Sequence, residues 1–297
     1  MLDGTRREDR CRNEVGLQMK YWILLAQYEP IEDYIQLAQD AEQLGYEGIL
    51  VADHVVFPVT LTTPHPVGHP TFSYELFPDP LSMIVAMASV TRTLRFATHV
   101  YVLPMRDPFP VAKQVATTAM LSQYRFAFGI GVGWLPEEFA LMGKDFRTRE
   151  ARTDEMIDIL RDLWDDGYAE YAGRFYRFDR CAMFPVPQQP IPIWGGGKSP
   201  SAIRRAARCD GALPMNTSFE HGKQLLLALS QARTALGKST DGFDVMVFLP
   251  NLDDVPRYLE LEGLKPTKGA VLLSTPQLTD LNAKRRALET TAARLRL

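Results

Sequence analysis

Short apolar runs alternate with longer, partly polar stretches along most of the chain. The runs are rich in Val, Ile, Leu and Phe, a pattern typical of strands that are buried on both faces of a parallel sheet. We predict eight such strands, at residues 20–26, 47–52, 94–102, 125–131, 191–194, 211–215, 243–249 and 268–274.

The stretches between these runs have helical spacing. In residues 31–44 a single stripe is predicted to face the core, and Gly45 should end the helix; the stripe is Ile31, Ile35, Ala38, Ala41 and Leu44. In residues 147–166 the predicted buried face is Met156, Ile157, Leu160, Leu163 and Trp164. Two more helices should begin at Asp79-Pro80 and Ser199-Pro200, because each pair combines a capping side chain with proline at the first helical position.

Eight strand–helix units over ~270 residues match the size of a closed (β/α)8 barrel, the TIM barrel. A doubly wound open sheet is the alternative with the same pattern. We predict one domain over residues 19–297. Residues 1–18 lack apolar periodicity, so we expect an unstructured or artefactual extension there.

Two insertions interrupt the alternation. Residues 57–80, after strand two, contain six prolines together with His65, His69 and several aromatic residues. A long connection of this kind is often a lid or binding loop, and in a barrel it would overhang the carboxyl ends of the strands. Residues 168–190, before strand five, are rich in aromatics and predict a small hairpin or a rim-packing segment.

Composition excludes several classes of protein. The net charge of −3 gives no basic excess for binding nucleic acid. Three cysteines, Cys11, Cys181 and Cys209, are too few and too scattered for a disulfide framework. No apolar run approaches the roughly 20 residues of a membrane span, and the first 18 residues lack the apolar stretch of a signal peptide. We therefore expect a cytoplasmic protein.

The segment "FGIGVGW" (128–134) carries Gly131 and Gly133 at a strand end. A dinucleotide-binding fingerprint would need glycine at position 134, where the chain has Trp134. Two interpretations remain. The glycines either allow the backbone to approach a flat ligand or allow tight packing of the strand.

The segment "WGGGKSPSAIRRAA" (194–207) resembles the end of a nucleotide-binding P-loop, but Pro192 stands where that motif needs glycine. The backbone N–H groups of Gly195, Gly196 and Gly197 and the start of the helix at Ser199 could still bind one anion. A simple turn without a ligand is the alternative.

Asp53 and His54 in "VADHVVFP" lie at the carboxyl end of strand two, where barrels present catalytic side chains. His54 could move a proton near neutral pH, or it could be a structural histidine. His65 and His69 lie in a proline-rich loop without nearby acidic or thiol ligands, so we predict no metal site. Since no nucleophile motif is present, a bound cofactor should perform the difficult chemical step.

Five blocks now support a family resemblance. They are "LGYEGILVADHVVFP", "VYVLPMRDPFPVAKQVAT", "GIGVGWLPEEFALMG", "GRFYRF" and "IPIWGGGKSPSAIRRAARCDG". Together they resemble the luciferase-like monooxygenase superfamily, and within it the oxidoreductases that use the deazaflavin coenzyme F420. The likeness spans about residues 19–215 and includes all five blocks in the family's order.

The resemblance implies a TIM barrel that binds a flavin or deazaflavin at its carboxyl mouth. His54 would lie near the redox ring as a proton donor or positioning group. Val100 and Tyr101 match the place where relatives press a bulged, often cis backbone against that ring. The other residues expected to bind the cofactor are Asp53, Gly131, Gly133, and, for its phosphate, Gly195, Gly196, Gly197 and Ser199.

The chain departs from the family pattern at two places. Gln123 and Tyr124 replace a pair of glycines before strand four, so a turn that tolerates positive φ should be altered. Trp134 stands where sugar-phosphate-oxidising relatives have a glutamate, and Glu137 or Glu138 cannot simply inherit its acid–base role.

We therefore predict an oxidoreductase that transfers hydride between F420 and a small organic substrate. A monooxygenase that uses reduced FMN and a non-catalytic flavin-binding barrel are the alternatives. As partners we expect a small-molecule substrate and a second copy of the chain in a homodimer, with no nucleic acid and no membrane.

Overall fold

The computed structural model describes residues 19–25, 31–60, 62–64, 77–273 and 280–297. The predicted extension at 1–18 lies outside the described residues. The same holds for 61 and 65–76, which include His65 and His69 of the predicted loop at 57–80.

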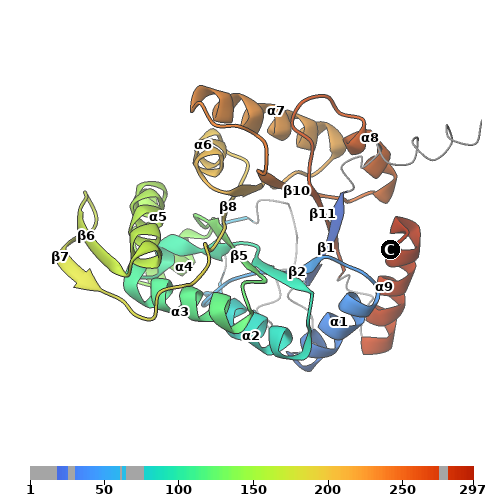
Figure 1. The fold of residues 1–297 in the computed structure, drawn as a ribbon, viewed down its shortest axis with the longest axis horizontal. Helices are drawn as coiled ribbons and strands as arrows, with labels where there is room; N and C mark the ends of the chain where they lie inside the picture. Colours follow the sequence, from blue (N-terminus) through green and yellow to red (C-terminus); the bar gives the residue numbers. More distant parts are fainter. Residues whose placement is uncertain (1–18, 26–30, 61, 65–76, 274–279) are drawn as a thin grey trace, which may run out of the picture.

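Within the described part of the chain, the predicted strands form a closed parallel barrel surrounded by helices (Figure 1). The barrel closes because β1 pairs with β11 as well as β2, and β5 pairs with β3 and β4 as well as β8. This confirms the TIM barrel and excludes the open sheet. The strands are β1 (Lys20–Leu25), β2 (Gly48–Val51), β3 (Arg95–Thr98), β4 (Tyr101–Val102), β5 (Phe126–Gly131), β8 (Ile193–Gly196), β9 (Gly211–Leu213), β10 (Asp244–Phe248) and β11 (Lys268–Leu272).

The strands match their predictions to within about two residues at each end, and two of them differ in a way that matters for the site. The run predicted as one strand at 94–102 is divided into β3 and β4, and the peptide bond between them, His99–Val100, is cis. The cis backbone that the resemblance implies at this place is thereby confirmed. The strand predicted at 191–194 begins and ends two residues later, so Gly195 and Gly196 belong to β8 rather than to the turn that follows it.

The helices cover the outside of the barrel. Both predicted cap-then-proline starts are confirmed, because Asp79 Oδ1 accepts a hydrogen bond from Ser82 N (2.8 Å) and Ser199 Oγ accepts one from Ala202 N (3.2 Å). The α-helices are α1 (Ile31–Gln43), α2 (Pro80–Val90), α3 (Pro108–Leu121), α4 (Pro136–Leu141), α5 (Arg149–Asp165), α6 (Pro200–Arg208), α7 (Phe219–Ala235), α8 (Val255–Leu259) and α9 (Leu281–Leu295). Short 3-10 turns are η1 (Leu103–Met105), η2 (Phe146–Thr148) and η3 (Leu252–Asp254).

The buried face of α1 is only partly the predicted one, because Ala38 and Ala41 are buried as expected but two other members of the stripe are not. Ile31 and Ile35 are 49% and 37% exposed. The residues that face the core are Tyr34, Leu37, Ala38 and Ala41. These four also follow helical spacing. The predicted stripe left out Tyr34 and Leu37, whose burial rotates the apolar face away from Ile31 and Ile35. The face predicted for the second helix is confirmed, since all five of its residues are buried on α5.

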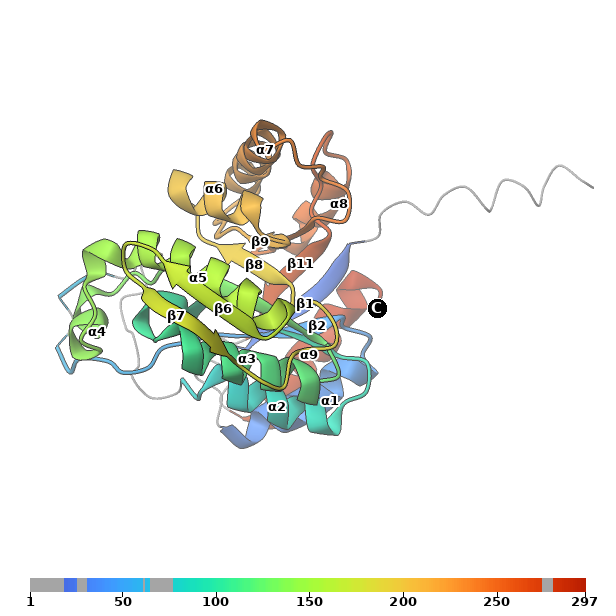
Figure 2. The ribbon, with the colours of Figure 1, turned by 60° about the vertical axis from the view of Figure 1, so that its left-hand side comes forward.

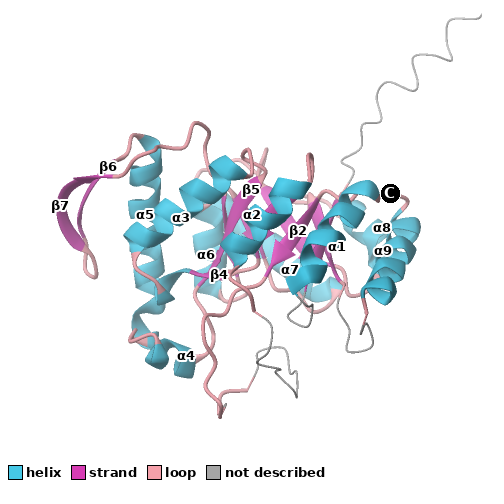
Figure 3. Ribbon diagram, turned by 90° about the horizontal axis from the view of Figure 1, so that it is seen from below, coloured by secondary structure: helices cyan, strands magenta, loops and turns pink. Residues whose placement is uncertain are grey.

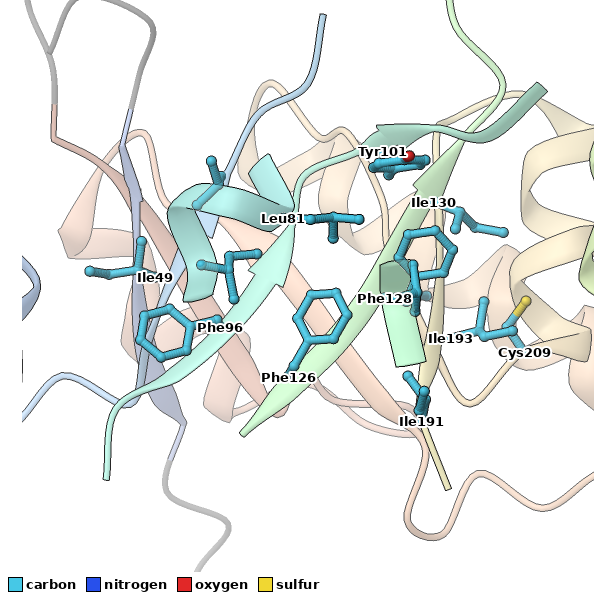
Figure 4. Packing of buried hydrophobic residues seen from close by; sticks show 14 of the residues in the cluster. Ile49, Leu81, Phe96, Tyr101, Phe126, Phe128, Ile130, Ile191, Ile193 and Cys209 are labelled. Carbon is cyan, nitrogen blue, oxygen red and sulfur yellow. The ribbon is translucent and has the colours of Figure 1, made fainter. Parts of the chain in front are cut away.

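The core has two layers because side chains alternate between the two faces of each strand. The inner layer fills the barrel; its members include Trp22, Leu50, Ala97, Trp194 and Met246. The outer layer lies between strands and helices, where Phe96 of β3 is the register partner of Phe126 of β5 (Figure 4).

The insertion before the fifth barrel strand forms the predicted hairpin, β6 (Tyr168–Ala172) with β7 (Arg177–Ala182). It lies outside the ring of helices, beside α5 (Figures 1 and 2). Its turn is bound by Glu155 of α5, whose carboxylate accepts hydrogen bonds from the backbone N–H groups of Arg174, Phe175 and Tyr176. The hairpin is therefore attached to the helix layer.

In the turn before β5, two side chains stand where the family pattern has glycines. Gln123 and Tyr124 both have positive φ, at 55° and 59°. The Tyr124 hydroxyl accepts a hydrogen bond from Gln188 N at 2.6 Å and so links this turn to the segment after the hairpin. Two non-glycine residues therefore adopt the left-handed backbone conformation that favours glycine.

Candidate active site

His54 and Glu138 form a buried pair at the carboxyl end of the barrel. His54 follows β2, and its Nδ1 lies 2.8 Å from Glu138 Oε2; the side chain of Glu138 is 2% exposed. A carboxylate only accepts hydrogen bonds, so the imidazole donates from Nδ1. The other oxygen of Glu138 accepts a hydrogen bond from Val55 N at 2.7 Å. Glu138 therefore orients the imidazole and the backbone that follows it.

Glu138 is carried by α4, which lies near the end of the barrel where β4 ends (Figure 3). Its neighbour Glu137 accepts hydrogen bonds from Thr62 N (3.2 Å) and Thr63 N (3.0 Å), and from both threonine hydroxyls. The Thr62 hydroxyl, followed by backbone and other side-chain donors, lowers the pKa of Glu137 to about 2. Two consecutive glutamates of α4 thus bind the segment after β2, Glu138 at residues 54–55 and Glu137 at residues 62–63.

Aromatic side chains surround the imidazole of His54. The ring centroids of Phe57, Phe77 and Trp134 lie 4.5, 4.7 and 6.0 Å from that of His54. Phe57 and Phe77 come from the two ends of the predicted loop, and Trp134 follows β5. The pair is therefore in an apolar environment, which strengthens its hydrogen bond.

Asp53 is buried and forms an ion pair within the chain. Its carboxylate accepts two hydrogen bonds from the Arg106 guanidinium, at 2.7 and 2.8 Å, and one from Val102 N at 2.8 Å. The guanidinium also lies 4.1 Å from the ring centroid of Tyr101. Asp53 thus joins the end of β2 to the segment after the cis bond, while the Tyr101 ring packs in the outer layer near Phe128 (Figure 4).

Val100 lies between glycines of two neighbouring strands. A Cβ atom at Gly131 would collide with Val100 Cγ2, and one at Gly196 would lie 2.5 Å from Val100 Cγ1. Gly133, with φ of +81°, is similarly close to Val102 and Phe139. At these positions the structure favours the packing interpretation of the glycines. It also brings Val100, Gly131 and Gly196 together.

Part of the predicted anion site takes part in strand pairing. Gly195 pairs with both neighbouring strands, and a Cβ there would lie 2.6 Å from Ala206 Cα of α6. The Gly197 N–H contacts the Leu213 carbonyl oxygen at 3.4 Å. The part of the site outside strand pairing is therefore the turn at 197–199 and the start of α6, where the Ser199 hydroxyl caps the helix.

Two residues at this end of the barrel were missed as site residues. Glu138 is 84 positions from His54, and no local spacing connects them. His99 was hidden in an apolar strand run; it is 7% exposed, and burial lowers its pKa to about 4. Among the described residues, no three His, Cys, Asp or Glu side chains are grouped as metal ligands. No helix of the described chain is long and apolar enough to cross a membrane.

A protein-family model described as luciferase-like monooxygenase matches residues 15–251. The chain belongs to this family. An uncharacterized protein of Mycobacterium tuberculosis is 36% identical to this luciferase-like protein over 218 residues, 72% of this chain and 75% of the relative. The F420-dependent glucose-6-phosphate dehydrogenase of Mycolicibacterium gilvum is 27% identical over 257 residues, 84% of this chain and 73% of that enzyme.

The same architecture occurs in solved structures of other proteins. Monooxygenase RslO1 from Streptomyces bottropensis superposes with a TM-score of 0.72 over 93% of this chain and 98% of that chain, at 19% identity. This likeness concerns the fold alone. Across the relatives, the family is one of oxidoreductases that depend on F420 or on a flavin.

Proposed function

We propose that this luciferase-like protein is an oxidoreductase that transfers hydride between F420 and a small organic substrate at the carboxyl mouth of its barrel. The observation that carries the proposal is the His54–Glu138 pair, a proton-transfer group at the same end of the barrel as Val100 and the cis bond. The likeness to F420-dependent glucose-6-phosphate dehydrogenases supports the choice of cofactor.

The residues present fit a flat cofactor with a phosphate on its arm. Leu24, Val100 and Phe248 are apolar and only partly buried at this end of the barrel, as suits contact with a ring face. The turn at 197–199 and the N-terminus of α6 would hold the phosphate through the helix dipole and backbone N–H groups that take no part in strand pairing. When bound, the cofactor supplies the hydride chemistry that no side chain of this protein can supply.

Within this proposal each residue of the pair has one role. His54 gives or takes a proton at Nε2, the nitrogen remote from Glu138. Glu138 holds the tautomer and stabilises the charged imidazole, as a buried carboxylate does for a catalytic histidine. Trp134, Phe57 and Phe77 exclude water from the imidazole. Asp53, predicted to bind the cofactor, would act indirectly by holding the segment from Val102 to Arg106.

The family description favours a second candidate, a monooxygenase that uses reduced FMN. A barrel that binds a flavin without catalysis is the third. We further propose a cytoplasmic homodimer, as the sequence led us to expect.

Titration with F420 and FMN distinguishes the candidates. We expect F420 to bind with a micromolar or lower Kd, measured by fluorescence, and FMN to bind more weakly. Tight FMN binding with oxygen-dependent oxidation of a substrate would favour the monooxygenase. Binding without turnover across a panel of small alcohols, aldehydes and sugar phosphates would favour the non-catalytic barrel.

His54→Ala tests the assigned proton transfer. We expect turnover to fall by ~10²-fold or more while the Kd of the cofactor changes little, because the imidazole acts on the proton and not on cofactor binding. His221→Ala, at a histidine in the first turn of α7 whose Nδ1 contacts Thr217 and not Glu138, is the matched control. Full activity of His54→Ala would remove the role of His54 and leave the fold unaffected.

A further inference from the structure

A second histidine lies inside the barrel at the same end. His99 follows β3, and by strand alternation it faces the interior as Ala97 does. Its ring centroid is 4.9 Å from that of Phe248, the last residue of β10. Its backbone N–H donates to the Val51 carbonyl oxygen at 2.7 Å, so the main chain at this point is fixed. The imidazole is therefore held next to Val100, at the mouth.

The Nε2 atom of His99 is buried and has no hydrogen-bond partner within the described chain. Burial lowers the pKa of the ring to about 4, so the imidazole is neutral at physiological pH. A neutral imidazole can donate from one nitrogen and accept at the other. An unsatisfied polar atom in an apolar site costs free energy comparable to a lost hydrogen bond. Leucine at this position would avoid that cost.

We infer that His99 Nε2 forms a hydrogen bond with the polar edge of the ring system that binds at the mouth. This inference rests on the proposed function, which puts a flavin or deazaflavin ring against Val100. Such rings combine an apolar face, suited to Val100 and Phe248, with carbonyl and N–H groups at their edge. His99 Nε2 is already removed from water before the ligand binds. A ligand that forms a hydrogen bond with it therefore gains that bond at little further cost in desolvation of the protein.

The test compares three proteins by cofactor affinity and thermal stability. His99→Leu removes the nitrogen and keeps an apolar side chain. His99→Gln keeps a polar group that reaches about as far as Nε2. We expect His99→Leu to bind F420, or FMN if that is the ligand, roughly tenfold more weakly, the loss of one net hydrogen bond. His99→Gln should remain within about threefold of the unmodified protein. The melting temperature of His99→Leu should be equal or higher, because a buried unsatisfied atom is gone.

The outcomes are distinct. If His99→Leu binds the cofactor as tightly as the unmodified protein does, the inference is overturned whatever the melting temperature. The histidine is then structural or binds a buried water. Equal weakening in His99→Leu and His99→Gln would also overturn it, because shape and not hydrogen bonding would then be responsible. If the unmodified protein binds neither F420 nor FMN, the proposed function itself fails. In the protein labelled with ¹⁵N at histidine, addition of the cofactor should also shift the Nε2 resonance of His99.

Discussion

At the scale of single residues, the structure favours the packing interpretation of glycines for which the sequence left a ligand-binding alternative open. Gly131 and Gly196 look like positions that admit a ligand, and Gly195 like part of a phosphate loop. In the folded chain their missing side chains leave space for Val100 and for α6. A glycine in a sequence indicates that something approaches the backbone closely, but the sequence does not say whether a ligand or the chain itself does so.

Glu138→Gln tests the orienting role of the carboxylate. The glutamine oxygen can still accept from Val55 N, but its NH2 group then faces His54 Nδ1 and favours the tautomer with hydrogen on Nε2. We expect kcat to fall by at least ~10²-fold while KM and the Kd of the cofactor change little. In ¹⁵N spectra of the resting protein, the His54 ring signal should move from the Nδ1–H to the Nε2–H tautomer.

The neighbouring glutamate provides the control for that variant. Glu137→Gln alters the same helix without touching His54 and should leave kcat within a few-fold of the unmodified protein. A purely structural role for Glu138 would appear as a lower melting temperature with an unchanged tautomer and unchanged kcat.

At the scale of elements, α4 and the segment after β2 form one unit whose stability depends on pH. The pKa of Glu137 is depressed from its ordinary 4.5 to about 2, mainly by the Thr62 hydroxyl. The unfolded chain therefore takes up this proton at a higher pH than the folded chain does. The stabilisation from Glu137 is complete above about pH 4.5 and is lost as the pH falls toward 2.

Amide exchange can follow this loss. Protection of the Thr62 and Thr63 amides should be constant from pH 7 to 5 and should decrease between pH 4.5 and 2, after correction for intrinsic rates. In Glu137→Gln the protection should be lower and should not follow this titration. Amides within β5 serve as the reference for global unfolding. Thr63 protection that tracks β5 at every pH would contradict the local role of Glu137.

The sequence predicted the strands and helix starts well because their causes are local. Apolar runs and cap-then-proline pairs such as Asp79-Pro80 act within a few residues. The sequence did not predict features that depend on contacts between distant parts of the chain. In α1 two apolar stripes have helical spacing, and the packing of the helix in the folded chain decides that Tyr34 is buried and Ile35 is not. The His54–Glu138 contact joins residues 84 positions apart, and only the closed barrel brings them together.

At the scale of the whole molecule, the barrel is closed by residues outside the matched family region. The family model ends at residue 251, before β11. Yet β11 pairs with β1 on one side and with β10 on the other, and Ala270 fills part of the barrel interior. Helix α9 then covers α1, where Lys284 forms an ion pair with Asp33 at 2.7 Å and Arg285 one with Asp40 at 2.6 Å.

Two truncations separate the contributions of these C-terminal elements. A chain ending at residue 251 would leave the edges of β1 and β10 unpaired and would open the inner core, so we expect it to aggregate or to lack a cooperative thermal transition. A chain ending at residue 280 keeps the closed barrel and loses only α9, so it should fold with a lower melting temperature. Both are measured by circular dichroism and size-exclusion chromatography. A soluble 1–251 chain with a cooperative transition would mean that seven barrel strands suffice, and that β11 completes the mouth without being needed for folding.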